Sequence, residues 1–295
     1  MSFGDKPLTL LDAPSNLGLR PPEEGAVPGC YKAPGVFRDA GLLARLNAHD
    51  AGVVTPPRYL SRWTPGTVRN EEAIADYSRT LASRIAPLLE HARLPVVLGG
   101  DCSILVGIGL ALHRAGRYGL VSLDGLDYRH PGNSDAVGAA GGESLAMVTG
   151  LGGALATLDG TRPYIRSGDT AAIGFRSDDE YADEAAAAGL RLVDAPAAGH
   201  DPIAAAEAAL AVVDSPGLDG FWIHVDADVI DSSLLPAVDS PEPDGLTFEQ
   251  LTAILRRLLE SPRVVGLDLT IYDPDRDPGL HGGKRLTEVL VDALS

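Results

Sequence analysis

Short apolar stretches recur along this chain, and each is followed by a segment long enough for a helix. Residues 94–98 and 118–123 are mainly apolar, and a third stretch of this kind lies at 220–225. A strand that is apolar on both faces is typical of a parallel sheet covered by helices on both sides. The alternation of strands and helices therefore predicts an α/β fold, a three-layer α/β/α sandwich with a mostly parallel sheet.

The length of 295 residues would suit one large α/β domain or two smaller ones. A Pro- or Ser-rich linker, an internal repeat and a low-complexity run are all absent from the sequence. We therefore predict a single domain over residues 1–295. The apolar runs are too short to span a bilayer, and the first residues lack a basic segment followed by an apolar core. We expect a cytoplasmic protein.

The formal net charge of −17 restricts the possible partners. Nucleic-acid backbones and anionic membranes would be repelled at long range, whereas a cationic small molecule would not. Cys30 and Cys102 are the only cysteines, and their spacing does not suggest a disulfide framework. A small-molecule substrate is the expected partner, and neither nucleic acid nor a membrane is.

Acidic residues cluster where the stretch at 220–225 ends, in the segment from His224 to Asp231. Because side chains alternate along a strand, Asp226 and Asp228 are predicted to share one face. Two neighbouring carboxylates repel one another unless a cation lies between them. One interpretation is a divalent metal or a pair of metals, and the other is a pair of solvated turn acids.

Two further apolar stretches end in residues that can bind metal. Asp101 and Cys102 follow the first, and Asp124 and Asp127 follow the second. Ligands of open parallel sheets bind beyond the carboxyl ends of the strands, so we expect Asp124 and Asp226 to converge. Oxygen ligands suit Mg²⁺ or Mn²⁺, whereas a thiolate favours Zn²⁺.

Cys102 lies where a helix is predicted to begin, which should favour the ionised thiol. The thiolate could then bind a metal or attack a substrate. The alternative is a small buried thiol that packs behind the turn formed by Gly99 and Gly100.

These motifs, in this order, resemble those of the ureohydrolase family of arginases and agmatinases. Members of that family have a three-layer α/β fold and a two-manganese site. Their motifs GGDHS, DAHxD and DxDxxD correspond here to Gly99–Ser103, Asp124–Asp127 and Asp226–Asp231. The likeness extends from the first predicted strand, which begins at Leu8, to Val289.

The resemblance implies a centre for Mn²⁺ or another divalent metal such as Zn²⁺. It further implies catalytic roles for two of the acids, and a homo-oligomer. Asp231 would lie beyond the residues that bind the metal directly and would orient their side chains. The implied metal ligands are Cys102, Asp124, Asp127, Asp226 and Asp228, of which Asp127 and Asp228 are the catalytic candidates.

The departures from the family motifs concern both the metal and the substrate. Cys102 stands where the family has a histidine ligand, and the segment from Asp124 to Asp127 is one residue short and contains no histidine. Ile271 occupies the position where members of the family have a glutamate that pairs with the guanidinium of the substrate. The family segment SGNxHG is also missing. The remaining candidates for substrate contact are His130, which could also serve as a substitute ligand, together with Asn133 and Ser134.

These observations favour a metal-dependent hydrolase of a linear C–N bond in an amidine, guanidine or amide, and not a standard arginase. The alternative is a non-catalytic homologue, a binding or oligomer-forming subunit with a degenerate metal site. A hydrolase with Cys102 as nucleophile is a third class, although no histidine has a convincing position as its base. A dinucleotide enzyme is disfavoured because Gly107 and Gly109 lie inside a predicted helix and lack the third glycine.

Overall fold

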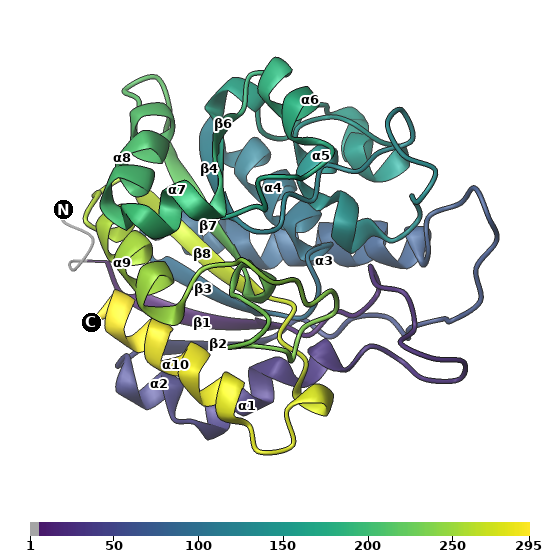
Figure 1. The fold of residues 1–295 in the computed structure, drawn as a ribbon, viewed down its shortest axis with the longest axis horizontal. Helices are drawn as coiled ribbons and strands as arrows, with labels where there is room; N and C mark the ends of the chain where they lie inside the picture. The colour runs from purple at the N-terminus through teal and green to yellow at the C-terminus, as the bar shows by residue number, and fades with distance from the viewer. Residues whose placement is uncertain (1–5) are drawn as a thin grey trace.

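The sheet of the protein has eight strands, all parallel, in a computed structural model that describes residues 6–295 (Figure 1). The strand order is β2-β1-β3-β8-β7-β4-β5-β6. The predicted parallel sheet is therefore confirmed. The strands are β1 Leu8–Ala13, β2 His49–Val53, β3 Leu94–Gly99, β4 Tyr118–Leu123, β5 Thr170–Ile173, β6 Arg191–Val193, β7 Gly220–Asp226 and β8 Val264–Thr270.

Helices cover both faces of this sheet, which completes the predicted three-layer sandwich (Figure 1). α1, α2, α7, α8, α9 and α10 pack on one face, and α3, α4, α5 and α6 on the other. The helices are α1 Ala33–Asp39, α2 Leu42–Arg45, α3 Glu71–Glu90, α4 Ile104–Ala115, α5 Ser144–Val148, α6 Ala182–Ala187, α7 Ala195–His200, α8 Pro202–Val213, α9 Phe248–Leu259 and α10 His281–Leu294.

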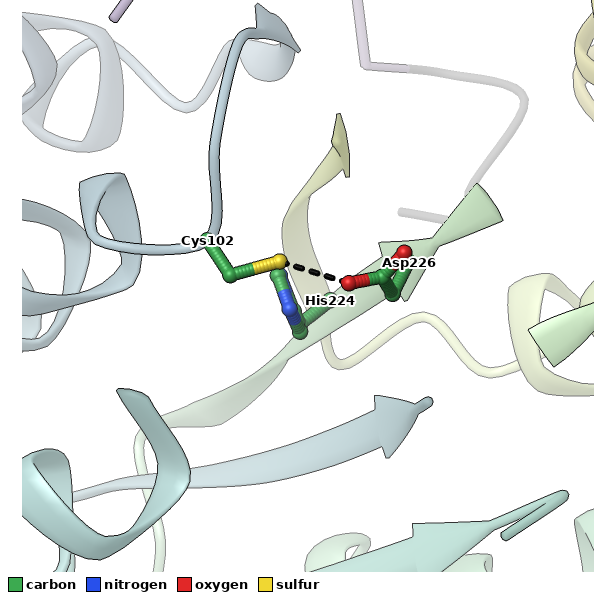
Figure 2. Close-up of side chains that lie close together, drawn as sticks. All are labelled: Cys102, His224 and Asp226. Atoms are coloured by element: carbon green, nitrogen blue, oxygen red, sulfur yellow. Dashed lines mark hydrogen bonds between the residues drawn. The ribbon is translucent and has the colours of Figure 1, made fainter. Parts of the chain in front are cut away.

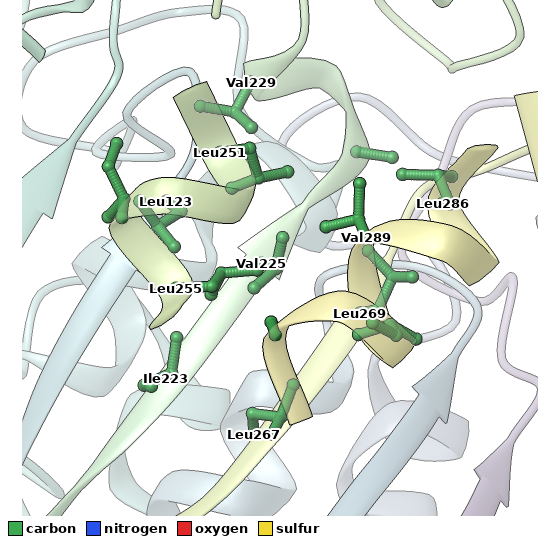
Figure 3. Close-up of a cluster of buried hydrophobic side chains, with 14 of the residues drawn as sticks. Leu123, Ile223, Val225, Val229, Leu251, Leu255, Leu267, Leu269, Leu286 and Val289 are labelled. Atoms are coloured by element: carbon green, nitrogen blue, oxygen red, sulfur yellow. The ribbon is translucent and has the colours of Figure 1, made fainter. Parts of the chain in front are cut away.

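Alternation along the central strands divides the apolar core between the two faces. Ile223 and Val225 of β7 pack with Leu251 of α9 and Val289 of α10 (Figure 3). Trp222, which directly precedes Ile223 in β7, packs on the opposite face with α3 and α4. Successive residues of a strand point to opposite faces, so both layers of the core are built from one strand.

Local signals set the ends of several helices. Thr247 and Gln250 form a capping box at the start of α9, where each side chain accepts from the other's backbone N–H. α1 and α2 are two separate helices, because Gly41 between them adopts a left-handed conformation. Within the described residues, none of the helices has the length and apolarity that crossing a membrane requires.

Gly266 of β8 packs directly beneath the indole of Trp222 on β7. A Cβ atom at position 266 would lie 2.7 Å from Cε3 of that fully buried ring. We expect Gly266→Ala to lower the free energy of unfolding by about 1–3 kcal/mol, because an overpacked core must shift. Urea unfolding measures the change. The control is Gly168→Ala, whose Cβ would meet open space; equal stability of the two variants would contradict the prediction.

Candidate metal centre

Three neighbouring strands, β4, β7 and β8, carry polar side chains toward the same end of the sheet. His224 on β7 is paired with Ser122 on β4 and with Asp268 on β8, and Asp226 is paired with Thr270. His224 and Asp226 lie on the face of β7 that Trp222 also occupies, since they follow it at intervals of two. This face changes from apolar to polar as the strands approach their carboxyl ends.

The first cluster of metal-ligand type consists of Cys102, His224 and Asp226 (Figure 2). One ligand atom from each lies within 4.8 Å of the others, and all three side chains are buried. Sγ of Cys102 donates to Oδ2 of Asp226 at 2.8 Å and lies 2.9 Å from Oγ1 of Thr270. A thiol, an imidazole and a carboxylate therefore meet in one place.

The second cluster consists of Asp124, Asp226 and Asp228, again with one oxygen from each within 4.8 Å of the others. The predicted convergence of Asp124 and Asp226 is thus confirmed. Among residues 6–295, both carboxylate oxygens of Asp124 and Oδ1 of Asp228 are buried without a hydrogen-bond partner, as is Nε2 of His224. Buried carboxylates without donors are costly, so these atoms suit a divalent cation.

Burial and mutual repulsion raise the pKa values of the three acids of the second cluster. Burial raises the pKa of Asp124 and that of Asp226 well above their ordinary values, and the neighbouring carboxylates raise them further. Burial also raises the pKa of Asp228, to about 6, although the nearby Arg176 guanidinium opposes the shift. Without a cation the cluster therefore holds protons, which a bound metal would displace.

His224 is held by a carboxylate behind it. Nδ1 lies 2.6 Å from Oδ2 of Asp268, while Nε2 faces Oδ2 of Asp124 at 3.8 Å. Burial alone would lower the pKa of His224, but Asp268 raises it, and the net shift is upward. His224 is not recognisable as a site residue from the local sequence, because its neighbours in the strand, Ile223 and Val225, are apolar. Strand alternation was the signal that could have found it, since His224 precedes Asp226 by two.

Two predictions made from the sequence are wrong: the shared strand face of Asp226 and Asp228, and the ionised thiol of Cys102. β7 ends at Asp226, and Asp228 lies in a 3₁₀ turn over Ala227–Val229, so the two acids do not share a strand face. They approach because the turn brings the N–H of Asp228 to Oδ1 of Asp226 at 2.9 Å. The Cys102 thiol is not favoured in its ionised form, because burial and the acids around it raise its pKa well above the ordinary value.

Asp127 and Asp231 lie outside both clusters. Asp127 borders the neighbouring pocket, and its Oδ2 accepts from Oγ of Ser144 at 3.1 Å. Oδ1 of Asp231 instead accepts from the backbone of Ser233 at 2.8 Å, which stabilises a turn. The roles predicted for the two acids stay predictions.

His130, Asn133 and Ser134 form a hydrogen-bonded loop beside α6. Nε2 of His130 lies 2.9 Å from a carboxylate oxygen of Glu184, and the amide of Asn133 donates to the other oxygen at 2.8 Å. Ser134 accepts from the hydroxyl of Tyr181 at 3.2 Å. Tyr181 borders the pocket, whereas the three loop residues do not line it. Their predicted contact with substrate, and the predicted metal binding by His130, stay predictions.

A pocket of about 190 Å³ opens over the second cluster. Ile271 lines it, and this buried β-branched residue has a φ of 71°, an unfavourable conformation that costs free energy. The other lining residues are Leu19, Arg20, Gly125, Leu126, Asp127, Arg129, Ala139, Gly141, Gly142, Asp179, Tyr181, Asp226, Asp228, Asp239, Ser240 and Glu242.

Fold and site together define an α/β protein with a carboxylate-rich centre at the carboxyl ends of a parallel sheet. The family model described as the Arginase family matches residues 24–293, and the chain belongs to this family. The ureohydrolase membership predicted from the motifs is therefore confirmed.

Curated relatives and solved structures agree with this assignment. The chain is 27% identical to the arginase of Agrobacterium fabrum (strain C58 / ATCC 33970) over 285 residues, which covers 91% of this chain and 87% of that protein. It is similar in structure to arginase from Bacillus caldovelox, with a TM-score of 0.87, 24% identity and 98% coverage of both chains. Formimidoylglutamase from Bacillus subtilis also has this fold, with a TM-score of 0.74, 20% identity and coverage of 100% of this chain and 91% of that one.

Proposed function

We propose that the protein is a metal-dependent hydrolase of a linear C–N bond in an amidine, guanidine or amide. The observation that carries the proposal is the set of buried carboxylate oxygens of Asp124 and Asp228 that have no hydrogen-bond partner among residues 6–295. A bound divalent metal, Mn²⁺ or Zn²⁺, would supply Lewis-acid activation of water and of the substrate.

Some residues of the site would bind the metal and others would transfer protons, according to their positions. Asp226 belongs to both clusters and would join them, with Asp124 and Asp228 on one side and Cys102 on the other. Asp127 and Asp228 both line the pocket. In the proposed reaction they would take a proton from the attacking water and return it to the leaving nitrogen. Burial raises the pKa of Asp127 well above its ordinary value, which suits a residue that both accepts and donates protons.

Ile271 restricts the substrates that this pocket would accept. Its apolar side chain lines the pocket in place of a group that could pair with a guanidinium. A guanidinium placed against Ile271 would have no carboxylate partner at that position, which would cost several kcal/mol. Asp179, Asp239 and Glu242 also line the pocket, so the loss concerns this one position and not the charge of the whole pocket. The proposed substrate therefore has a less charged or more apolar tail than arginine.

We accordingly expect little turnover of free arginine, whichever metal is supplied. The assay measures urea or ammonia release from arginine, agmatine, guanidinobutyrate and formimino compounds, with Mn²⁺, Zn²⁺ and Ni²⁺ in turn. Ile271→Glu should lower the KM for guanidinium substrates relative to the parent, and Ile271→Leu, which remains apolar, should not. Arginine turnover by the parent at an ordinary enzymatic kcat of ~1–10³ s⁻¹ would refute the prediction.

A second candidate is a non-catalytic member of the family that binds ligands or forms oligomers. It is favoured by the segment Asp124–Asp127, which contains no histidine and places the buried Leu126 against the pocket. The same assay separates the candidates. Absence of turnover across the panel, together with no metal in the purified protein, would support the non-catalytic function.

A further inference from the structure

We propose that Cys102, His224 and Asp226 form a mixed thiolate, imidazole and carboxylate site that selects Zn²⁺ or Co²⁺ over Mn²⁺. The inference rests on the proposed function, which requires a metal, and it specifies which residues choose that metal. It also assigns His224 as a ligand, which the sequence motifs did not indicate.

The geometry of the cluster matches a small tetrahedral ion. Ligand bonds of about 2.0–2.3 Å place the ligand atoms of such a site roughly 3.3–3.8 Å apart. The three candidate atoms already lie within 4.8 Å of one another, and the thiol and carboxylate are in hydrogen-bond contact at 2.8 Å. The ion would take the place of the thiol proton, and small rotations of the side chains would accommodate it. Asp124, near the imidazole, or a water could provide the fourth ligand.

The network behind His224 is a second, independent observation. Asp268 contacts Nδ1 of His224 at 2.6 Å through one oxygen and accepts from Nε1 of Trp222 at 2.6 Å through the other. All three side chains are fully buried. A carboxylate bound to the remote nitrogen of a histidine fixes the ring and increases its basicity as a ligand. Nε2, which has no hydrogen-bond partner among residues 6–295, is the nitrogen left for a metal.

The types of donor determine which metal this site would prefer. Thiolate and imidazole favour Zn²⁺ and Co²⁺, whereas Mn²⁺ prefers carboxylate oxygens and water. The second cluster contains only carboxylates, so the two clusters differ in selectivity although they share Asp226. A sulfur ligand can be detected directly, since Co²⁺ bound to a thiolate gives a charge-transfer absorption band in the near ultraviolet.

The test uses the full chain, treated with chelator and then titrated with Co²⁺, Zn²⁺ or Mn²⁺. We expect the charge-transfer band in the parent and in Cys30→Ser, a matched variant of the other buried cysteine, and its loss in Cys102→Ser. His224→Gln should weaken Zn²⁺ binding at least ~10-fold and reduce the preference for Zn²⁺ over Mn²⁺. Asp268→Asn should weaken Zn²⁺ binding in the same direction, with circular dichroism confirming that each variant is folded.

The outcomes separate this inference from the proposed function. Co²⁺ binding without the band, or a band that persists in Cys102→Ser, would overturn the thiolate site and leave metal-dependent hydrolysis standing. Unchanged metal preference in a folded His224→Gln would overturn the role of the imidazole. Failure of the parent to bind any of the three ions would overturn the inference and the proposed function together.

Discussion

Replacing Asp226 by Asn is expected to abolish the metal-dependent rise in melting temperature while leaving the metal-free protein at least as stable as the parent. Asp226 contributes to both clusters, so its loss removes a shared ligand. An amide can still accept the hydrogen bond from the N–H of Asp228, and it replaces a buried carboxyl group that is stable there without metal only when it holds a proton. In the parent, a metal at about 100 times its Kd would add ~2.7 kcal/mol to the free energy of unfolding.

Thermal unfolding with and without Zn²⁺ or Mn²⁺ measures this difference. The control variant is Asp178→Asn, an exposed acid that belongs to neither cluster, which should keep the full metal-dependent shift. If Asp226→Asn and the parent gain equally, or if neither gains, the clusters are not the metal site. Asp226→Asn should also reduce kcat/KM at least ~10²-fold on any substrate that the parent hydrolyses, because the proposed shared metal ligand is lost.

The metal-free protein is expected to lose stability as the pH rises above about 4, where the carboxyl groups of the unfolded chain release their protons. The pKa values of Asp124 and Asp226 are raised by burial, and the pKa of Asp228 is raised to about 6, so the folded state retains protons that the unfolded chain has released. The free energy of unfolding therefore falls with increasing pH, by about 1.4 kcal/mol per pH unit for each such group, until the pKa of the folded state is passed. For Asp228 this fall ends near pH 6.

His224 also lowers the free energy of unfolding of the metal-free protein as the pH rises, although it is a base. Its pKa is raised above the ordinary value, since the effect of Asp268 exceeds that of burial, so the folded state again binds more protons than the unfolded chain. Urea unfolding at several pH values, with chelator present, gives the slope. We expect a shallower slope in Asp226→Asn and a flat or reversed slope with saturating metal, which holds the acids ionised. Stability that rises with pH in the metal-free parent would contradict the predicted protonation.

The sequence was most informative where strands are buried. β3, β4 and β7 were predictable because apolar side chains fill both of their faces, as a covered parallel strand requires. β2 escaped prediction because this edge strand is largely exposed, so His49–Val53 has no apolar pattern. Elements at the edge of a sheet are specified by pairing with a distant strand, which local sequence does not reveal.

The same distinction applies to the candidate metal centre. Asp124 and Asp226 were predictable because parallel strands present their carboxyl ends at one edge. The protonation state of Cys102 was not predictable, because it depends on burial and on acids that other strands contribute, and not on the nearby helix. The contacts of His130 with Glu184 likewise depend on how a loop folds back over α6. Chain topology locates the centre, whereas its protonation is a property of the assembled interior.

The position of β8 has a consequence for the order of assembly. β8 is the last strand in sequence, yet it lies between β3 and β7 in the middle of the sheet (Figure 1). While the chain emerges from a ribosome, the strands made before β8 can pair in their native order only as two partial sheets, whose open inner edges would be prone to mispairing. The pairing of β3 with β8 closes a loop of roughly 170 residues, an entropically slow step. Because Asp268 and Thr270 arrive with β8, the centre is completed only when the two halves join, and metal uptake would mark the final stage of biosynthetic folding.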